Sequence, residues 1–306
     1  MTAQKELWKK LLQAEKKSRS GKFSRWLRSP FRYPVLMLFN HLLYPVVKKG
    51  IYVRANTFFG LPLRTLLPSG TDVMLNGIKS HDSEIRLSKF LTRTLHEGDV
   101  FIDVGAHYGY YSLLASVLVG NSGKVYSIEA SYSSFVGLKE NIDIMKNINS
   151  YHAAAGDAEG SITFYEYPGP YAEYNTTVRN AYVGQKWYQL VKEKVNTVPI
   201  LIPDHLLTNE GIVKATLKID VEGGEAAVIR GLQNSLAEKD LVVAMEYLLP
   251  SEGSKLHREA ADLLYAKGYQ SYAITDDGTL THVADIDEYL KGRKLNSDNI
   301  IFNRAV

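Results

Sequence analysis

Cysteine is absent from all 306 residues. The chain therefore has no disulfide bond, no thiolate zinc site and no cysteine nucleophile. A cysteine-free chain suits the reducing cytosol, and we expect a cytoplasmic protein. A long apolar run is missing too, because the apolar stretch 33–47 includes two prolines and is shorter than the roughly 20 residues of a spanning helix.

Acidic residues are scarce near the start of the chain. Residues 1–70 contain two glutamates against fourteen lysines and arginines, so this segment carries a net charge of +12 and residues 71–306 carry −9. A basic arm on an acidic body predicts a negatively charged partner, either anionic lipid or nucleic acid. Two interpretations of residues 1–50 stay open. One is peripheral contact with an anionic membrane, at its inner face. The other is a helical cap packed on the domain or on a second copy.

The most informative stretch is residues 99–112, Asp-Val-Phe-Ile-Asp-Val-Gly-Ala-His-Tyr-Gly-Tyr-Tyr-Ser. Its apolar start, its two glycines and its apolar continuation predict a buried strand, a turn and a helix. Such a turn lets backbone amides approach a ligand. The spacing of Gly105 and Gly109 does not match the dinucleotide fingerprint G-x-G-x-x-G. Asp103 stands at the strand end and indicates a ligand with a cationic group.

Strands and helices alternate after this turn, which predicts a mostly parallel sheet with helices on both faces. We expect two regions, a basic helical and β appendage over residues 1–75 and a main domain over residues 76–306. In the appendage, residues 51–75 have the pattern of a β-meander, and in the main domain residues 168–195 form an aromatic insertion. The expected strands are 124–129, 151–155, 161–167, 214–221, 241–246, 271–275 and 299–303.

Carboxylates follow several of these strands, where a ligand of an open α/β sheet binds. Glu129 is placed to accept hydrogen bonds from both hydroxyls of a ribose, and Asp157 from the exocyclic amine of adenine. Asp103 would meet a positively charged tail and would repel a pyrophosphate. Adenine, ribose and a cationic tail together describe S-adenosylmethionine.

Four runs of the sequence resemble the FkbM-type class I methyltransferases, in the same order. They are 99–112, Val125–Ala130, Leu138–Asn141 and Leu217–Glu225, the last reading Leu-Lys-Ile-Asp-Val-Glu-Gly-Gly-Glu. The resemblance covers about residues 80–250. It implies a Rossmann-like fold whose seven-stranded sheet has an antiparallel last strand, S-adenosylmethionine as methyl donor, and a hydroxyl acceptor on a sugar or other natural product.

The resemblance also assigns cofactor contacts, with Glu84 near the amino-acid end of the donor. The cofactor-binding residues that we expect are Glu84, Asp103, Gly105, Ala106, Gly109, Tyr111, Glu129, Ala130 and Asp157.

Methyl transfer to a hydroxyl requires removal of its proton by a general base, or its acidification by a metal. The candidates are Asp220, Glu222, Glu246 and His107. Asp220 ranks first, as base or as a divalent-metal ligand together with Glu246. Glu225 suits a helix cap equally well.

The leading hypothesis is an S-adenosylmethionine-dependent O-methyltransferase acting on a glycan or another hydroxylated acceptor, which in one version is lipid-linked. The aromatic insertion 168–195 would stack on a sugar ring or act as a lid, or else pack only on itself. The first alternative function is an NAD-dependent oxidoreductase. The second is a nucleic-acid methyltransferase or binding module that uses the basic arm, and the acidic body disfavours it.

Overall fold

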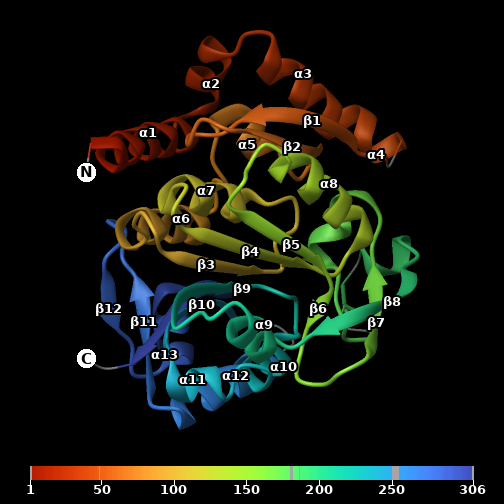
Figure 1. Ribbon diagram of the computed structural model, residues 1–306. Coiled ribbons are helices and arrows are strands. Elements are labelled where there is room, and N and C mark those ends of the chain that lie inside the picture. The colour runs from red at the N-terminus through yellow and green to blue at the C-terminus, as the bar shows by residue number, and fades with distance from the viewer. Residues whose placement is uncertain (1, 48, 180–181, 186, 250–254, 305–306) are drawn as a thin grey trace.

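The computed structural model describes residues 2–47, 49–179, 182–185, 187–249 and 255–304 (Figure 1). Its main sheet has the strand order β12-β11-β13-β10-β9-β3-β4-β5. The strands are β3 (Val100–Val104), β4 (Lys124–Glu129), β5 (Ile148–His152), β9 (Lys214–Ile219), β10 (Asp240–Leu248), β11 (Tyr269–Ile274), β12 (Leu280–His282) and β13 (Ser297–Arg304).

The predicted sheet is confirmed, including its antiparallel last strand. Strands β5, β4, β3, β9 and β10 are mutually parallel, and β13 runs antiparallel to β10 and β11. An eighth strand, β12, adds a hairpin edge beside β11. Its three residues are all exposed, so no apolar alternation marks it in the sequence.

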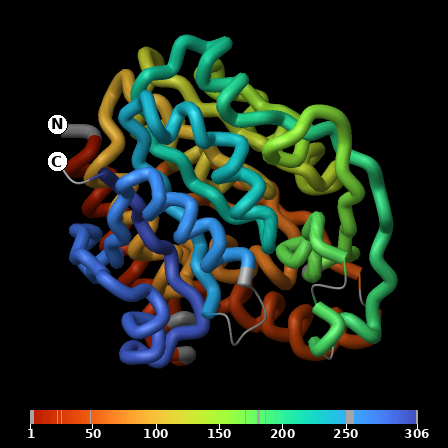
Figure 2. The backbone as a smooth tube through the Cα atoms, turned by 90° about the horizontal axis from the view of Figure 1, so that it is seen from below, coloured from red at the N-terminus to blue at the C-terminus, as the bar shows by residue number. Residues whose placement is uncertain are grey.

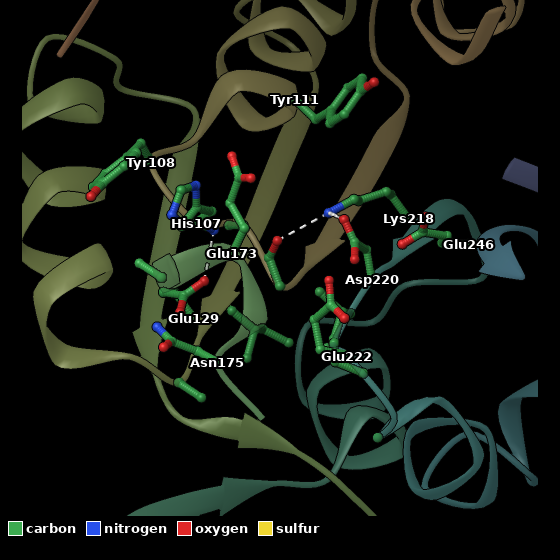
Figure 3. A pocket seen from close by; sticks show the side chains of 18 of the residues that line it. His107, Tyr108, Tyr111, Glu129, Glu173, Asn175, Lys218, Asp220, Glu222 and Glu246 are labelled. Carbon is green, nitrogen blue, oxygen red and sulfur yellow. Dashed lines mark hydrogen bonds and ion pairs between the residues drawn. The ribbon is translucent and has the colours of Figure 1, made fainter. Parts of the chain in front are cut away.

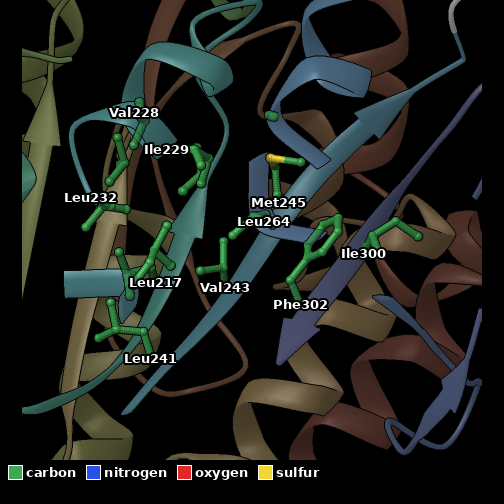
Figure 4. Packing of buried hydrophobic residues seen from close by; sticks show 14 of the residues in the cluster. Leu217, Val228, Ile229, Leu232, Leu241, Val243, Met245, Leu264, Ile300 and Phe302 are labelled. Atoms are coloured by element: carbon green, nitrogen blue, oxygen red, sulfur yellow. The ribbon is translucent and has the colours of Figure 1, made fainter. Parts of the chain in front are cut away.

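Helices cover both faces of the sheet (Figure 1). One face carries α6 (Asp82–Thr94), α7 (Tyr110–Val119) and α8 (Tyr132–Ile142). The other carries α9 (Pro203–Asn209), α10 (Glu225–Arg230), α11 (Ser235–Glu238), α12 (Lys255–Ala266) and α13 (Ile286–Arg293). On this second face Leu217 and Val243 of the sheet pack among Val228, Ile229 and Leu264 of the helices (Figure 4). The central strands are therefore buried on both sides, as their continuous apolar runs predict.

The strand order reverses beside β3. The chain passes from β3 to β4 and β5 on one side, and later returns through β9 and β10 on the other. In a sheet of this kind the crevice at the carboxyl ends of the two diverging strands is where ligands bind.

The appendage contains α1 (Thr2–Ser18), α2 (Lys22–Arg28), α3 (Arg32–Leu38), a π-helical segment (Phe39–Leu43), α4 (Tyr44–Val47), the hairpin β1 (Ile51–Asn56) and β2 (Pro62–Leu67), and α5 (Thr71–Asn76). The expected β-meander over 51–75 is therefore wrong, because the hairpin is followed by a helix. Leu7 and Leu11 of α1 join one hydrophobic cluster with α6 and α7, so the core continues across residue 75. Among the described residues, none of the helices has the length and apolar character needed to cross a membrane.

A second, three-stranded sheet has the order β6-β8-β7, from β6 (Ala154–Ala155), β7 (Ser161–Glu166) and β8 (Lys194–Leu201). The predicted strand 151–155 is thus divided, because Ala154 and Ala155 pair with β8 rather than with β4. The aromatic insertion joins β7 to β8 and contains two short 3-10 helices, Gly169–Tyr174 and Tyr188–Leu190. Seen from below, it lies at the edge of the molecule near the red N-terminal helices (Figure 2).

Candidate active site

A cavity of about 600 Å³ lies at the carboxyl ends of β3, β4 and β9. This volume is typical of a small-molecule site. The turn after β3, residues 79–84, α5 and the insertion contribute to its walls. Most of the predicted site residues line it: Glu84, Gly105, Ala106, His107, Tyr111, Glu129, Ala130, Asp157, Asp220, Glu222 and Glu246. Asp103 and Gly109 are not among the lining residues.

The turn after β3 needs glycine at position 105. Gly105 has a φ of +79°, and a Cβ there would lie 1.8 Å from the carbonyl oxygen of Asp220. The amides of Gly105 and Ala106 both donate to the carbonyl oxygen of Ile128, at 2.9 and 3.1 Å. The backbones of β3, β4 and β9 therefore come together at this turn.

Glu129 is held beneath the same turn (Figure 3). Its carboxylate accepts hydrogen bonds from the amides of His107, at 2.6 Å, and Ser131, at 2.8 Å. Burial raises the pKa of Glu129 to about 7, and these amide bonds offset only part of the desolvation. The carboxylate is therefore fixed in position on the cavity wall, with acceptor capacity left for a ligand.

Asp103 lies below the turn and not on the cavity wall, which corrects the expectation of direct contact with a cationic tail. It is 1% exposed and accepts a hydrogen bond from Ser112 at 2.6 Å. It is also the register partner of Lys218 on β9. Gly109 is also not on the cavity wall. It is the N-cap residue of α7, and a Cβ there would meet Leu138 at 2.6 Å.

Lys218 is a site residue that the sequence analysis missed. Its Nζ donates to the carbonyl oxygen of Gly105 at 3.0 Å and lies 3.1 Å from Asp220 and 3.7 Å from Asp103. Burial disfavours its charge, but these two carboxylates outweigh burial and raise the pKa of Lys218. The available signal was a lysine within a buried apolar strand, which requires charged partners.

Lys79 is a second cation on the cavity wall that sequence reasoning missed. Its Nζ lies 3.1 Å from Glu84, whose carboxylate also accepts a 2.6 Å hydrogen bond from the hydroxyl of Tyr111. Burial acts against its charge, yet Glu84 and Asp220 raise the pKa of Lys79 overall. Lys79 lies in the connection between α5 and α6, where the local pattern gives no signal for it.

Asp220, Glu222 and Glu246 form an acidic trio, in which one carboxylate oxygen of each lies within 4.8 Å of the others. Burial and the charge of Asp220 raise the pKa of Glu246 to about 8 and that of Glu222 well above its usual value. Burial also acts on Asp220, but Lys218 and Lys79 outweigh it and lower the pKa of Asp220. Asp220 is therefore ionised at neutral pH, Glu222 holds its proton, and Glu246 is partly ionised.

His107 adopts a φ of +51° in the turn, and burial together with Lys79 and Lys218 lowers its pKa to about 3. Its ring is therefore neutral and a very weak base. Glu225 accepts hydrogen bonds from the amides of Val221 and Gly223, so it organises the turn before α10.

Asp157 lies at the margin of the cavity. Its carboxylate is 2.6 Å from Nε of Arg230. The exocyclic amine of adenine would therefore share this carboxylate with Arg230.

Trp187 is the centre of the aromatic insertion. It stacks on Tyr171 and Tyr174, with ring centroids 4.8 Å apart in both pairs. The insertion is also tied to the acidic trio, because the hydroxyl of Tyr182 donates to Glu222 at 2.8 Å. It therefore packs on itself and also borders the cavity, where Glu173 and Asn175 are among its lining residues (Figure 3).

Comparison with known proteins decides the family. The family model described as the methyltransferase FkbM domain matches residues 103–271. The chain belongs to the FkbM methyltransferase family. A comparison with curated proteins gave no match.

Several solved structures are similar to this chain at low identity. Methyltransferase FkbM from Methylobacillus flagellatus KT is 13% identical, with 77% of this chain and 52% of that chain covered and a TM-score of 0.41. An S-adenosylmethionine-dependent O-methyltransferase from Thermotoga maritima is 14% identical, with 86% and 82% covered and a TM-score of 0.40. Precorrin-6y C5,15-methyltransferase from Geobacter metallireducens GS-15 is 12% identical, with 72% and 88% covered and a TM-score of 0.38. Similarities at this level carry no information about the acceptor.

The FkbM methyltransferase uses S-adenosylmethionine as its cofactor, and the cavity fits this ligand. Glu129 offers a fixed acceptor for ribose hydroxyls, and the partly buried charges of Glu84, Asp220 and Lys79 suit a zwitterionic, cationic tail. The alternative of an NAD-dependent oxidoreductase is therefore wrong.

Proposed function

We propose that this FkbM methyltransferase transfers a methyl group to a hydroxyl of a glycan or similar natural product. We propose further that this acceptor is lipid-linked and that the enzyme binds it at the inner face of an anionic membrane. The observation that carries the proposal is the acidic trio on the wall of the cofactor cavity, in which one carboxylate is ionised and two have raised pKa values. A hydroxyl acceptor needs such a group because it must give up its proton.

The chain's own residues would hold the donor in a fixed direction. Glu129 would accept from the ribose hydroxyls, Glu84 and Asp220 would attract the ammonium group, and Lys79 would attract the carboxylate. When bound, S-adenosylmethionine supplies an electrophilic methyl group on a sulfonium. Fixed alignment of acceptor oxygen, methyl carbon and sulfur can contribute roughly 7–11 kcal/mol to such a reaction.

Glu246 is the carboxylate best tuned to take the acceptor proton. An efficient general base has a pKa near the working pH, and the pKa of Glu246 is about 8. Asp220 is the weaker base because Lys218 stabilises its charge, which reverses the order expected from sequence. With the donor bound, the ionised form of Glu246 would take the proton that the acceptor hydroxyl gives up, and S-adenosylmethionine would supply the methyl group and leave as S-adenosylhomocysteine.

A divalent metal at the acidic trio is the second candidate for activating the hydroxyl. Mg²⁺ prefers carboxylate oxygens and would acidify a bound hydroxyl. Activity of the purified enzyme after treatment with EDTA separates the two mechanisms, because only the metal mechanism loses activity and regains it with Mg²⁺.

The aromatic insertion supports a sugar acceptor. Aromatic faces with polar edges suit contact with a sugar ring, and Tyr174 lines the cavity. Tyr182 joins this wall to Glu222 of the trio.

The test follows methyl label from S-adenosylmethionine into a lipid and glycan extract and then treats the product with alkali. We expect alkali-stable label, because an ether survives conditions that hydrolyse a methyl ester. Replacement of Glu246 by Gln should lower the rate by about 10²–10⁴-fold, whereas Glu288→Gln on α13, outside the lining residues, should not.

Three results would contradict the proposal: no binding of S-adenosylhomocysteine by calorimetry, alkali-labile label, or label only in nucleic acid. The last result would instead support the nucleic-acid alternative.

A further inference from the structure

The basic arm divides into two parts with different surroundings. Helix α1 packs on the domain, since Leu11 is fully buried and Lys89 of α6 lies 2.7 Å from Glu15. The side chain of Gln4 also donates to the carbonyl oxygen of Thr92 at 2.8 Å. The cap interpretation therefore describes α1.

The segment from α2 to α4 is apolar on its outer face as well. Its inner face contributes Leu36 and Phe39 to a small buried cluster with Leu67. Ten further large hydrophobic side chains of residues 23–47 are exposed, including Phe31 at 84% and Val46 at 82%. We call these ten side chains the outer apolar surface: Phe23, Trp26, Leu27, Phe31, Val35, Leu38, Leu42, Leu43, Val46 and Val47. A surface helix normally shows polar residues on the side away from the core, so this surface indicates a partner.

The charge of this segment indicates which partner. Residues 16–71 contain no Asp or Glu, and Arg28, Arg32 and Lys49 are exposed beside the outer apolar surface. Exposed aromatic and aliphatic side chains flanked by basic residues suit the headgroup layer of an anionic bilayer. We propose that the outer apolar surface of α2 to α4 docks into an anionic lipid bilayer, with these helices lying in its plane.

A second copy of the chain fits this surface less well. A two-fold interface brings the same patch of both copies together. Two patches with basic residues and no acidic ones would place like charges opposite each other, which costs free energy. Anionic lipid supplies the missing negative charge.

The docking helices also support a wall of the cavity. Asn40 donates to the hydroxyl of Thr71 at 2.9 Å, and Thr71 begins α5, whose Asp72 and Val73 line the cavity. In Figure 2 the red N-terminal helices and the green insertion lie near each other. Docking would therefore hold the cavity wall that α5 forms next to lipid. The acceptor would then be a membrane-resident lipid that carries a hydroxylated headgroup. This consequence rests on the proposed function, but the docking itself is independent of it.

Flotation of the full chain with vesicles tests the docking. Vesicles of phosphatidylcholine alone are compared with vesicles containing about 30% phosphatidylserine, at low and high salt, because salt screens the headgroup attraction. The full chain should float with the anionic vesicles and much less with the neutral ones. The double variant Phe31→Ser/Val46→Ser should bind roughly tenfold or more weakly, because it removes two exposed apolar anchors.

The matched control is Ile144→Ser/Val213→Ser, which removes two exposed hydrophobic side chains elsewhere, at 62% and 72% exposure. It should float like the unchanged chain. Both variants should bind S-adenosylhomocysteine normally, so that a failure of docking is distinct from a failure of the cofactor site. Absence of flotation, equal flotation of both double variants, or a dimer that only Phe31→Ser/Val46→Ser dissociates would overturn the proposal.

Discussion

The close approach of β3 and β9 at Gly105 makes a quantitative prediction. In Gly105→Ala the new methyl group would meet the carbonyl oxygen of Asp220 at 1.8 Å, so the two strand ends must separate. The residue would also hold a φ of +79°, which costs an L-residue about 1–2 kcal/mol. Overpacking adds roughly 1–3 kcal/mol. The free energy of unfolding should therefore fall by about 2–5 kcal/mol.

Gly268 provides a matched control for the backbone part of this cost. Its φ is +81°, and a Cβ there would meet no atom within 4 Å. The free energy of unfolding of Gly268→Ala should therefore fall only by the conformational cost, about 1–2 kcal/mol. Urea unfolding of both variants isolates the contact with Asp220 as the difference between them. Calorimetry should show weakened binding of S-adenosylhomocysteine for Gly105→Ala alone, because the turn also positions Glu129. Equal losses of stability in the two variants would refute the reasoning about close approach.

Three further predictions concern the cofactor, the fold and the insertion. Glu129→Gln should weaken S-adenosylhomocysteine binding by about 10–100-fold, since hydrogen bonds to a charged group contribute roughly 1.5–3 kcal/mol. Wild-type affinity should fall as pH drops through about 7, because the carboxyl then gains a proton, and a flat pH profile would argue against this role. Arg86→Met should cost about 3–5 kcal/mol in urea unfolding, because it leaves Asp298 buried without its 2.7 Å partner. The exposed Arg258→Met serves as its control. Trp187→Ala should raise the KM for the acceptor while S-adenosylhomocysteine affinity stays unchanged, and a loss of both would assign the insertion a purely structural role.

Much of the fold and the location of the site were predictable from local patterns. The run around Asp103 and Gly105 predicts a strand and a glycine turn, and the structure has both. The carboxylates Glu129 and Asp220 come directly at the ends of apolar strands. Since parallel strands present their carboxyl ends at one edge, the two meet at one cavity.

The sequence by itself thus determined the alternation of strands and helices around the main sheet, the edge of that sheet where the cavity lies, and the family. Tertiary structure decided which groups line that cavity and how strongly they hold protons. Asp103 lies beneath the wall, although its register partner Lys218 on β9 lines the cavity, and Lys79 reaches the cavity from the connection between α5 and α6. The different pKa shifts of Asp220 and Glu246 follow from burial and from charges brought close by folding. A local pattern fixes how a residue sits in its own element, but its electrostatic surroundings come from segments far away in the chain.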